Sequence, residues 1–105
     1  MTAHPGLLET ARHLILAREA EWAGTGIFSE IETSPNEHAF HSLSWILDGP
    51  EFSAQLVIWE DGRSELDLID VAAGEVRSEH REVGEEGDLR STLDTVVNWV
   101  VRTWQ

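Results

Sequence analysis

The chain has 105 residues, which suits one domain with a single hydrophobic core, and its 41% apolar residues argue against wholesale disorder. Twenty Asp and Glu against seven basic residues, all of them Arg, give a formal charge of -13, which repels nucleic acid and anionic membranes and attracts basic protein surfaces. The chain has no cysteine, no secretory signal and no apolar stretch long enough to cross a bilayer, so we expect a cytoplasmic protein without disulfides or Cys-based metal sites.

The first predicted element is an amphipathic helix. Pro5 suits its first position because the missing N–H costs nothing there, and Gly24 and Gly26 predict its end because glycine accepts the positive φ of helix termini. The apolar residues on its predicted inner face are Leu7, Leu8, Ala11, Leu14, Ile15 and Trp22. A short strand over 27–33 and a turn over 34–36 follow.

An alternation of apolar and polar residues begins near residue 39 and predicts strands. Gly49 and Pro50 separate two of them, and a two-residue loop there sets Leu47 against Phe52, so that the apolar faces of both strands coincide. The sequence therefore predicts a β-hairpin with one buried face.

The next turn allows two loop lengths. A two-residue loop would place the apolar Ile58 against Glu65, whereas a three-residue loop over 60–62 places Leu56 against Leu66. We therefore predict the three-residue loop, with its glycine in the left-handed conformation that this residue favours.

A third strand is predicted from Arg63 to about residue 71, with an irregularity after Leu68, where the apolar positions change parity. A turn over 72–74 leads to a polar fourth strand over 75–83. Charges on both of its sides are typical of an edge strand that is protected against aggregation.

The last predicted element is an amphipathic helix after an acidic loop over 84–88, capped at Asp88 or Ser91. Its apolar stripe consists of Leu89, Leu93, Val96, Val97, Val100 and Trp104. The predicted fold is thus one α+β domain over 1–105, with an N-terminal helix, a three- to four-stranded antiparallel meander sheet and a C-terminal helix.

No residue pattern indicates catalysis, a metal site or a cofactor. His38 and His41 lie three apart, which puts them on opposite faces of a strand, and the other histidines have no ligand pattern around them. Carboxylate pairs are abundant, but a hydrolytic pair needs a shaped cavity, and most of these residues lie in turns or on an open sheet face. We therefore expect a binding protein rather than an enzyme, with no catalytic residues, metal ligands or cofactor.

The acidic residues concentrate in one segment. Residues 48–88 hold thirteen carboxylates against three Arg, which accounts for ten of the thirteen net negative charges. In the predicted register, Glu65 and Asp67 project to the same side of the sheet as Trp59. We interpret this side and its rim as the surface that meets a basic partner. The predicted partner-binding residues are Trp59, Glu60, Asp61, Glu65, Asp67 and Trp99.

Five tryptophans are many for a chain of this length. Trp22, Trp45 and Trp104 lie on inward stripes, which predicts core packing. Trp59 and Trp99 do not, and we interpret both as exposed anchors for a partner. A helix that covers the outer face of the sheet and buries Trp59 is the alternative.

The second half of the chain resembles a known family. Leu-Val-Ile-Trp-Glu-Asp-Gly over 56–62, Glu-Leu-Asp-Leu-Ile-Asp over 65–70 and Ala-Ala-Gly over 72–74, followed by an amphipathic helix, are similar to TriTu-type immunity proteins of bacterial polymorphic toxin systems. The resemblance implies that the protein neutralises a cognate toxin domain in the producing or a neighbouring cell. It implies no catalytic residues.

Two functional hypotheses follow, and an enzyme with an unrecognised carboxylate site is a third option. The first is an immunity protein whose acidic sheet face covers a basic surface of the toxin domain, with a salt-sensitive association rate. The second is an acidic homodimer that acts as a secretion chaperone or scaffold. Sedimentation separates them, because a strict monomer excludes the chaperone hypothesis and leaves the inhibitor hypothesis intact.

Overall fold

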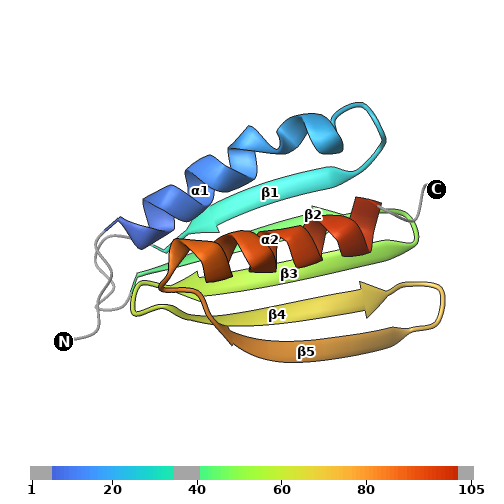
Figure 1. Ribbon diagram of the computed structural model, residues 1–105. Helices are drawn as coiled ribbons and strands as arrows, with labels where there is room; N and C mark the ends of the chain where they lie inside the picture. Colours follow the sequence, from blue (N-terminus) through green and yellow to red (C-terminus); the bar gives the residue numbers. More distant parts are fainter. Residues whose placement is uncertain (1–5, 35–40, 102–105) are drawn as a thin grey trace.

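A computed structural model describes residues 6–34 and 41–101, in which two helices pack on one side of a five-stranded antiparallel sheet (Figure 1). The strands follow one another across the sheet in chain order, so the topology is a simple meander. The elements are α1 (Leu7–Ala17), a 3-10 helix (Glu19–Glu21), β1 (Phe28–Thr33), β2 (Ser42–Asp48), β3 (Phe52–Trp59), β4 (Arg63–Asp70), β5 (Glu75–Glu82) and α2 (Glu86–Val101).

The predicted α+β class and the order of helix, antiparallel meander and helix are confirmed, but three to four strands is wrong. The short strand predicted over 27–33 is confirmed as β1, but it also joins the sheet, as an edge beside β2 with Ile31 opposite Trp45. The sequence Phe-Ser-Glu-Ile-Glu-Thr has only one apolar residue on its inner side, so the alternation did not attach it to the sheet. Hydrogen bonding of its backbone to β2 holds it there.

The first helix is shorter than its apolar pattern suggests. It ends at Ala17, and Trp22 reaches the core through the 3-10 helix that follows instead of from the helix itself. Gly24 and Gly26 have φ of 78° and 85°, which confirms the predicted positive values, although they lie in the connection to β1. Pro5 lies outside the described residues.

The first hairpin has a different register from the predicted one. Leu47 pairs with Ala54, and the backbone N–H of Gly49 donates to the carbonyl of Phe52 at 3.0 Å, so the turn residues are 50–51. Gly49 pairs so closely with Phe52 that the position has no room for a side chain. An added Cβ would lie 2.9 Å from the Phe52 carbonyl oxygen. The slip is two residues, so every side chain keeps its predicted face.

The second hairpin has the predicted register. Leu56 pairs with Leu66 across a loop over 60–62, and Gly62 has a φ of 96°. The irregularity expected after Leu68 is absent, because β4 pairs regularly with β3 up to its last residue and Ile69 simply points to the outer face. The polar strand β5 is the other edge of the sheet, as predicted.

The second helix begins earlier than either predicted cap. The backbone N–H of Leu89 donates to the carbonyl of Glu85 at 3.0 Å, so Asp88 and Ser91 lie inside the helix. Its buried stripe is the predicted one and also includes Thr92, whose hydroxyl accepts a hydrogen bond from Arg81. Trp104 lies outside the described residues.

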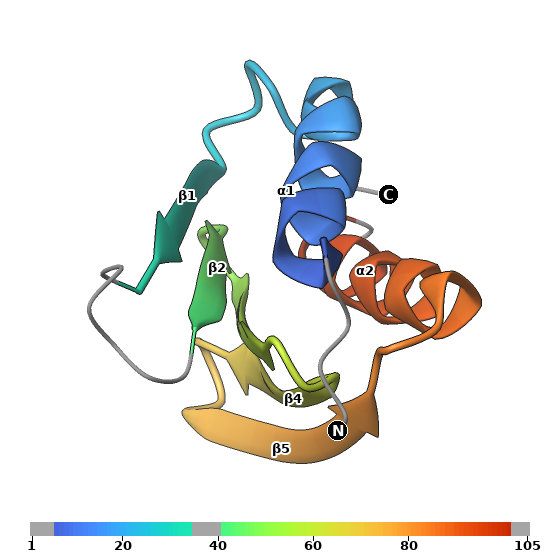
Figure 2. The same cartoon turned by 90° about the vertical axis from the view of Figure 1, so that its left-hand side faces the viewer.

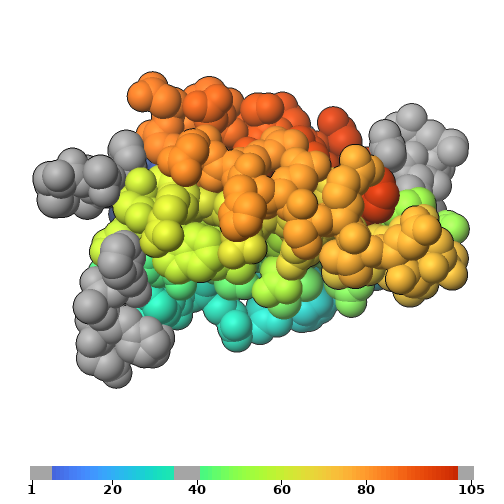
Figure 3. Space-filling view, turned by 90° about the horizontal axis from the view of Figure 1, so that it is seen from below, coloured from blue at the N-terminus to red at the C-terminus, as the bar shows by residue number. Residues whose placement is uncertain are grey.

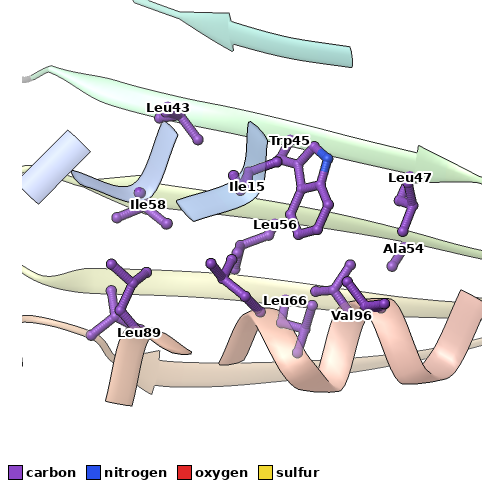
Figure 4. Packing of buried hydrophobic residues seen from close by; sticks show 14 of the residues in the cluster. Ile15, Leu43, Trp45, Leu47, Ala54, Leu56, Ile58, Leu66, Leu89 and Val96 are labelled. Carbon is purple, nitrogen blue, oxygen red and sulfur yellow. The ribbon is translucent and has the colours of Figure 1, made fainter. Parts of the chain in front are cut away.

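The core lies between the inner face of the sheet and both helices. Figure 4 shows Ile15 from α1 and Val96 from α2 beside Leu56 and Trp45, which project from the sheet. The Trp45 indole N–H donates to the Ser29 hydroxyl at 3.0 Å, so its burial leaves no polar group unpaired. No helix within the described ranges is both long and apolar enough to pass through a membrane.

Candidate partner-binding surface

Among the residues that the structure describes, no element covers the outer side of the sheet. Both helices pack on the inner side, and the sheet curves around them, as Figure 2 shows. From below, β4 and β5 lie uncovered beside α2 (Figure 3). Trp59 therefore stays on the outer side, where it is half-buried and covered by neither helix. The alternative that a helix covers this side is thus excluded for α1 and α2.

We call this outer side the open face. Strand alternation places six carboxylates and one arginine on it, and every strand contributes at least one charged or polar residue. Its carboxylates are Glu30, Glu32, Asp48, Glu65, Asp67 and Glu82, and its arginine is Arg63. Within the described ranges, none of these six carboxylates forms an ion pair. The open face is therefore strongly negative.

The thirteen carboxylates of residues 48–88 do not all lie together. Four of them are on the open face, and the others lie in turns, at the start of α2 or on the inner side of β4 and β5. Asp61, Glu79 and Glu86 are engaged in ion pairs with arginines 2.7 to 2.9 Å away. The predicted concentration of charge is thus only partly a property of one surface. Glu30 and Glu32 of β1 add to it from outside the segment.

One end of the open face carries a shallow hollow of about 310 Å³. On the open side it is lined by Trp59, Arg63, Glu65, His80 and Glu82, which come from three neighbouring strands. The Arg63 guanidinium lies over the indole of Trp59, with its Cζ 5.7 Å from the ring centroid. The hollow thus combines an aromatic surface with two carboxylates that have no ion-pair partner within the described ranges.

Arg63 is held in this position by Asp61. Its Nε donates to the Asp61 carboxylate at 2.7 Å, and its backbone N–H donates to the same carboxylate at 3.1 Å. The hydrogen bond from the backbone N–H is the main reason that the pKa of Asp61 is lowered, and the guanidinium lowers it further. The turn between β3 and β4 therefore fixes both an ionised carboxylate and the cation beside Trp59.

Five of the six predicted binding residues lie at or beside the open face. Glu65 and Asp67 project from β4 onto it, and Asp67 accepts a hydrogen bond from Ser78 at 2.6 Å. Trp59 ends β3, and the next two residues, 60–61, form the adjoining turn. The sequence thus predicted the side of the sheet on which Trp59, Glu65 and Asp67 lie, although it did not identify the contributions of β1 or β5 to that side.

Trp99 lies apart from the other five. It is half-buried between α2 and the inner side of the sheet rather than exposed as predicted, because its indole N–H donates to the carbonyls of Ser53 and Ile69, both at 3.1 Å. Its ring packs edge-on against Phe52 at 4.9 Å, and the guanidinium of Arg77 lies 5.8 Å from its centroid. The structure thus places this side chain on the opposite side of the sheet from Trp59.

Two exposed apolar side chains on the open face were not predicted. Phe28 in β1 is 57% exposed, and Val76 in β5 is 61% exposed. They occupy the two edges of a single cross-strand row, which runs through Asp48, Ser53 and Ile69. Strand alternation would have placed them there once β1 and β5 were assigned to the edges. They add apolar contact area to the negative surface.

The described residues contain no group of three or more His, Asp and Glu side chains arranged to hold a metal ion. His80 projects alone onto the open face, opposite Glu65, and His13 is exposed on α1. His4 and His38 lie outside the described residues. The open face therefore offers carboxylates, aromatic surface and apolar edges, a combination that suits contact with another protein.

Comparison with known proteins identifies the family. No curated protein and no solved structure matches the chain significantly. The family model described as Immunity protein TriTu matches residues 10–99, which spans the sheet and most of both helices. The chain therefore belongs to the TriTu immunity protein family.

Proposed function

We propose that this protein neutralises a cognate toxin domain by laying the open face of its sheet over a basic surface of that domain. Membership of an immunity protein family supports a toxin as the partner. The observation that carries the proposal is the set of six open-face carboxylates, none of which is neutralised by an ion pair within the described ranges. The action is binding, with no catalytic step.

Charge complementarity explains why these carboxylates remain without arginine partners. The described ion pairs use Arg18, Arg63, Arg81 and Arg90, and their acceptors lie in turns, on helices or on the inner side of β5. A negative face of this kind attracts a basic surface over a distance of about one Debye length and orients it before contact. Toxin domains that act on nucleic acid need such a basic surface, and covering it would block their substrate.

The open face also offers what a stable complex needs beyond charge. Trp59 is half-buried, and Phe28 and Val76 are exposed at opposite edges of the sheet. Aromatic and apolar anchors contribute most of the affinity of a typical interface, whereas peripheral charges mainly accelerate association. We propose the cytoplasm as the site of this encounter, which the cysteine-free sequence supports.

Association kinetics test this proposal. The toxin domain is sought in a secreted protein encoded immediately upstream, and its association with this chain is followed by stopped-flow fluorescence at increasing salt. We expect the association rate constant to fall by about tenfold or more between low and high salt, with a much smaller change in the dissociation rate. Co-expression should also protect cells from the toxin domain. An association rate that does not depend on salt would reject the electrostatic mechanism.

A further inference from the structure

We propose that the hollow beside Trp59 is the binding site for one arginine side chain of the partner, whose guanidinium bridges Glu65 and Glu82. This inference rests on the proposed function and names the group that the open face recognises most specifically. The hollow has a volume of about 310 Å³ and lies at the end of β3, β4 and β5. It is large enough to admit a side chain and too shallow to enclose a larger ligand.

The spacing of the two carboxylates fits a guanidinium. Glu65 pairs with His80, and Glu82 follows two residues later on the same face of β5, so the two carboxylates are diagonal neighbours. Such neighbours lie about 7–8 Å apart, with their Cβ atoms somewhat closer, which leaves room for a planar group that donates to both. An ammonium group is more compact and lacks this planar arrangement of donors, so it matches two separated carboxylates less well.

The protein already shows how this site receives a guanidinium. Arg63 lies over the Trp59 ring at 5.7 Å, although its cross-strand partner on β5 is Glu82. Arg63 is instead paired with Asp61 at 2.7 Å, and among the described residues it forms no ion pair with Glu82. The carboxylate of Glu82 is thereby left for an incoming cation, which would lie beside Arg63 at the rim of the same indole.

The hollow favours a cation although two arginines balance its two glutamates in number. Arg63 is paired with Asp61, and Arg81 is paired with Glu79 at 2.9 Å and donates to the hydroxyl of Thr95 at 3.2 Å. Both guanidinium charges are therefore compensated locally. Glu65 and Glu82 have no ion pair among the described residues, so they set the sign of the field that a partner meets.

The probe is Nα-acetyl-arginine amide, titrated into the full chain while backbone and indole N–H resonances are followed by NMR. We expect the largest saturable shifts at the Trp59 indole and at the backbone amides of residues 65, 80 and 82. The Glu65→Gln/Glu82→Gln variant keeps the shape of both side chains, so folding is not at issue. It should bind the probe about fivefold more weakly.

The matched control is Glu30→Gln/Glu32→Gln, which removes the same charge from β1 on the same face and should change the affinity less than twofold. Nα-acetyl-lysine amide should bind more weakly than the arginine probe. Three results would overturn the proposed arginine-binding site. They are equal weakening by both double variants, equal affinity for both probes, and no shift at the Trp59 indole. If toxin association still depends on salt, any of these results overturns only the arginine-binding site and leaves the proposed function unaffected.

Discussion

The indole N–H of Trp99 donates to the backbone carbonyl of Ser53 at 3.1 Å and so joins α2 to the sheet on the side opposite the open face. Trp99→Phe removes this donor and leaves acceptors within a half-buried contact unpaired. We expect the free energy of unfolding to fall by about 1–3 kcal/mol in urea denaturation. Trp59→Phe, which changes an indole on the open face, is the control and should cost less. Equal losses would contradict the assignment of Trp99 to the fold.

The turn between β3 and β4 depends on glycine at position 62. Its φ of 96° is a conformation that residues with a Cβ rarely adopt, so Gly62→Ala should destabilise the protein by about 1–3 kcal/mol. Gly87→Ala is the control, because Gly87 lies in α2 with nothing within 4 Å of an added Cβ, and it should be neutral or slightly stabilising. Thermal unfolding of both variants checks this, and a neutral Gly62→Ala would contradict the turn geometry.

Through Asp61, the contribution of this turn to stability depends on pH. Its folded-state pKa is lowered below 3.8, first by the backbone N–H of Arg63, so its contribution to stability is present above the unfolded pKa and is lost as pH falls through the folded pKa. Carboxyl ¹³C NMR should show Asp61 titrating below 3.8. Arg63→Gln should keep the larger part of the shift, since the backbone N–H remains. Return of the pKa to its ordinary value in that variant would show that the guanidinium is the main cause.

The open face also bears on self-association. Two copies that met through it would bring together the carboxylates of both, in a protein with a net charge of -13. We therefore expect sedimentation equilibrium at micromolar concentration to give the mass of a monomer at low salt. A dimer under these conditions would instead favour the acidic chaperone or scaffold hypothesis.

The sequence predicted the strand register correctly where a wrong register would place a charged residue opposite an apolar one. The pairing of Leu56 with Leu66 could be chosen by comparing loop lengths, because the wrong length puts a charge opposite an apolar residue. The first hairpin was misplaced by two residues because that slip leaves the faces unchanged and gives no such conflict. In the observed register a Cβ at position 49 would lie 2.9 Å from the Phe52 carbonyl oxygen, a constraint that alternation does not reveal.

The surface was predicted less completely than the core, for a related reason. Glu65 and Asp67 were found because β4 has a regular alternation, whereas Glu30 and Glu32 were missed because β1 has almost no apolar residues to assign it to the sheet. The orientation of Trp99 depends on hydrogen bonds to backbone carbonyls, which leave no trace in the order of side chains. Long-range backbone contacts therefore limit what the sequence alone can locate.

The most direct test of the central claim compares the affinity of two double variants for the cognate toxin domain by isothermal titration calorimetry. Glu65→Lys/Asp67→Lys reverses charge on the open face, and Glu19→Lys/Asp88→Lys changes the net charge equally on the helical side. We expect the open-face variant to lose about 100-fold in affinity and the helical-side variant only a few-fold. Equal losses, or no loss in the open-face variant, would contradict binding through this surface.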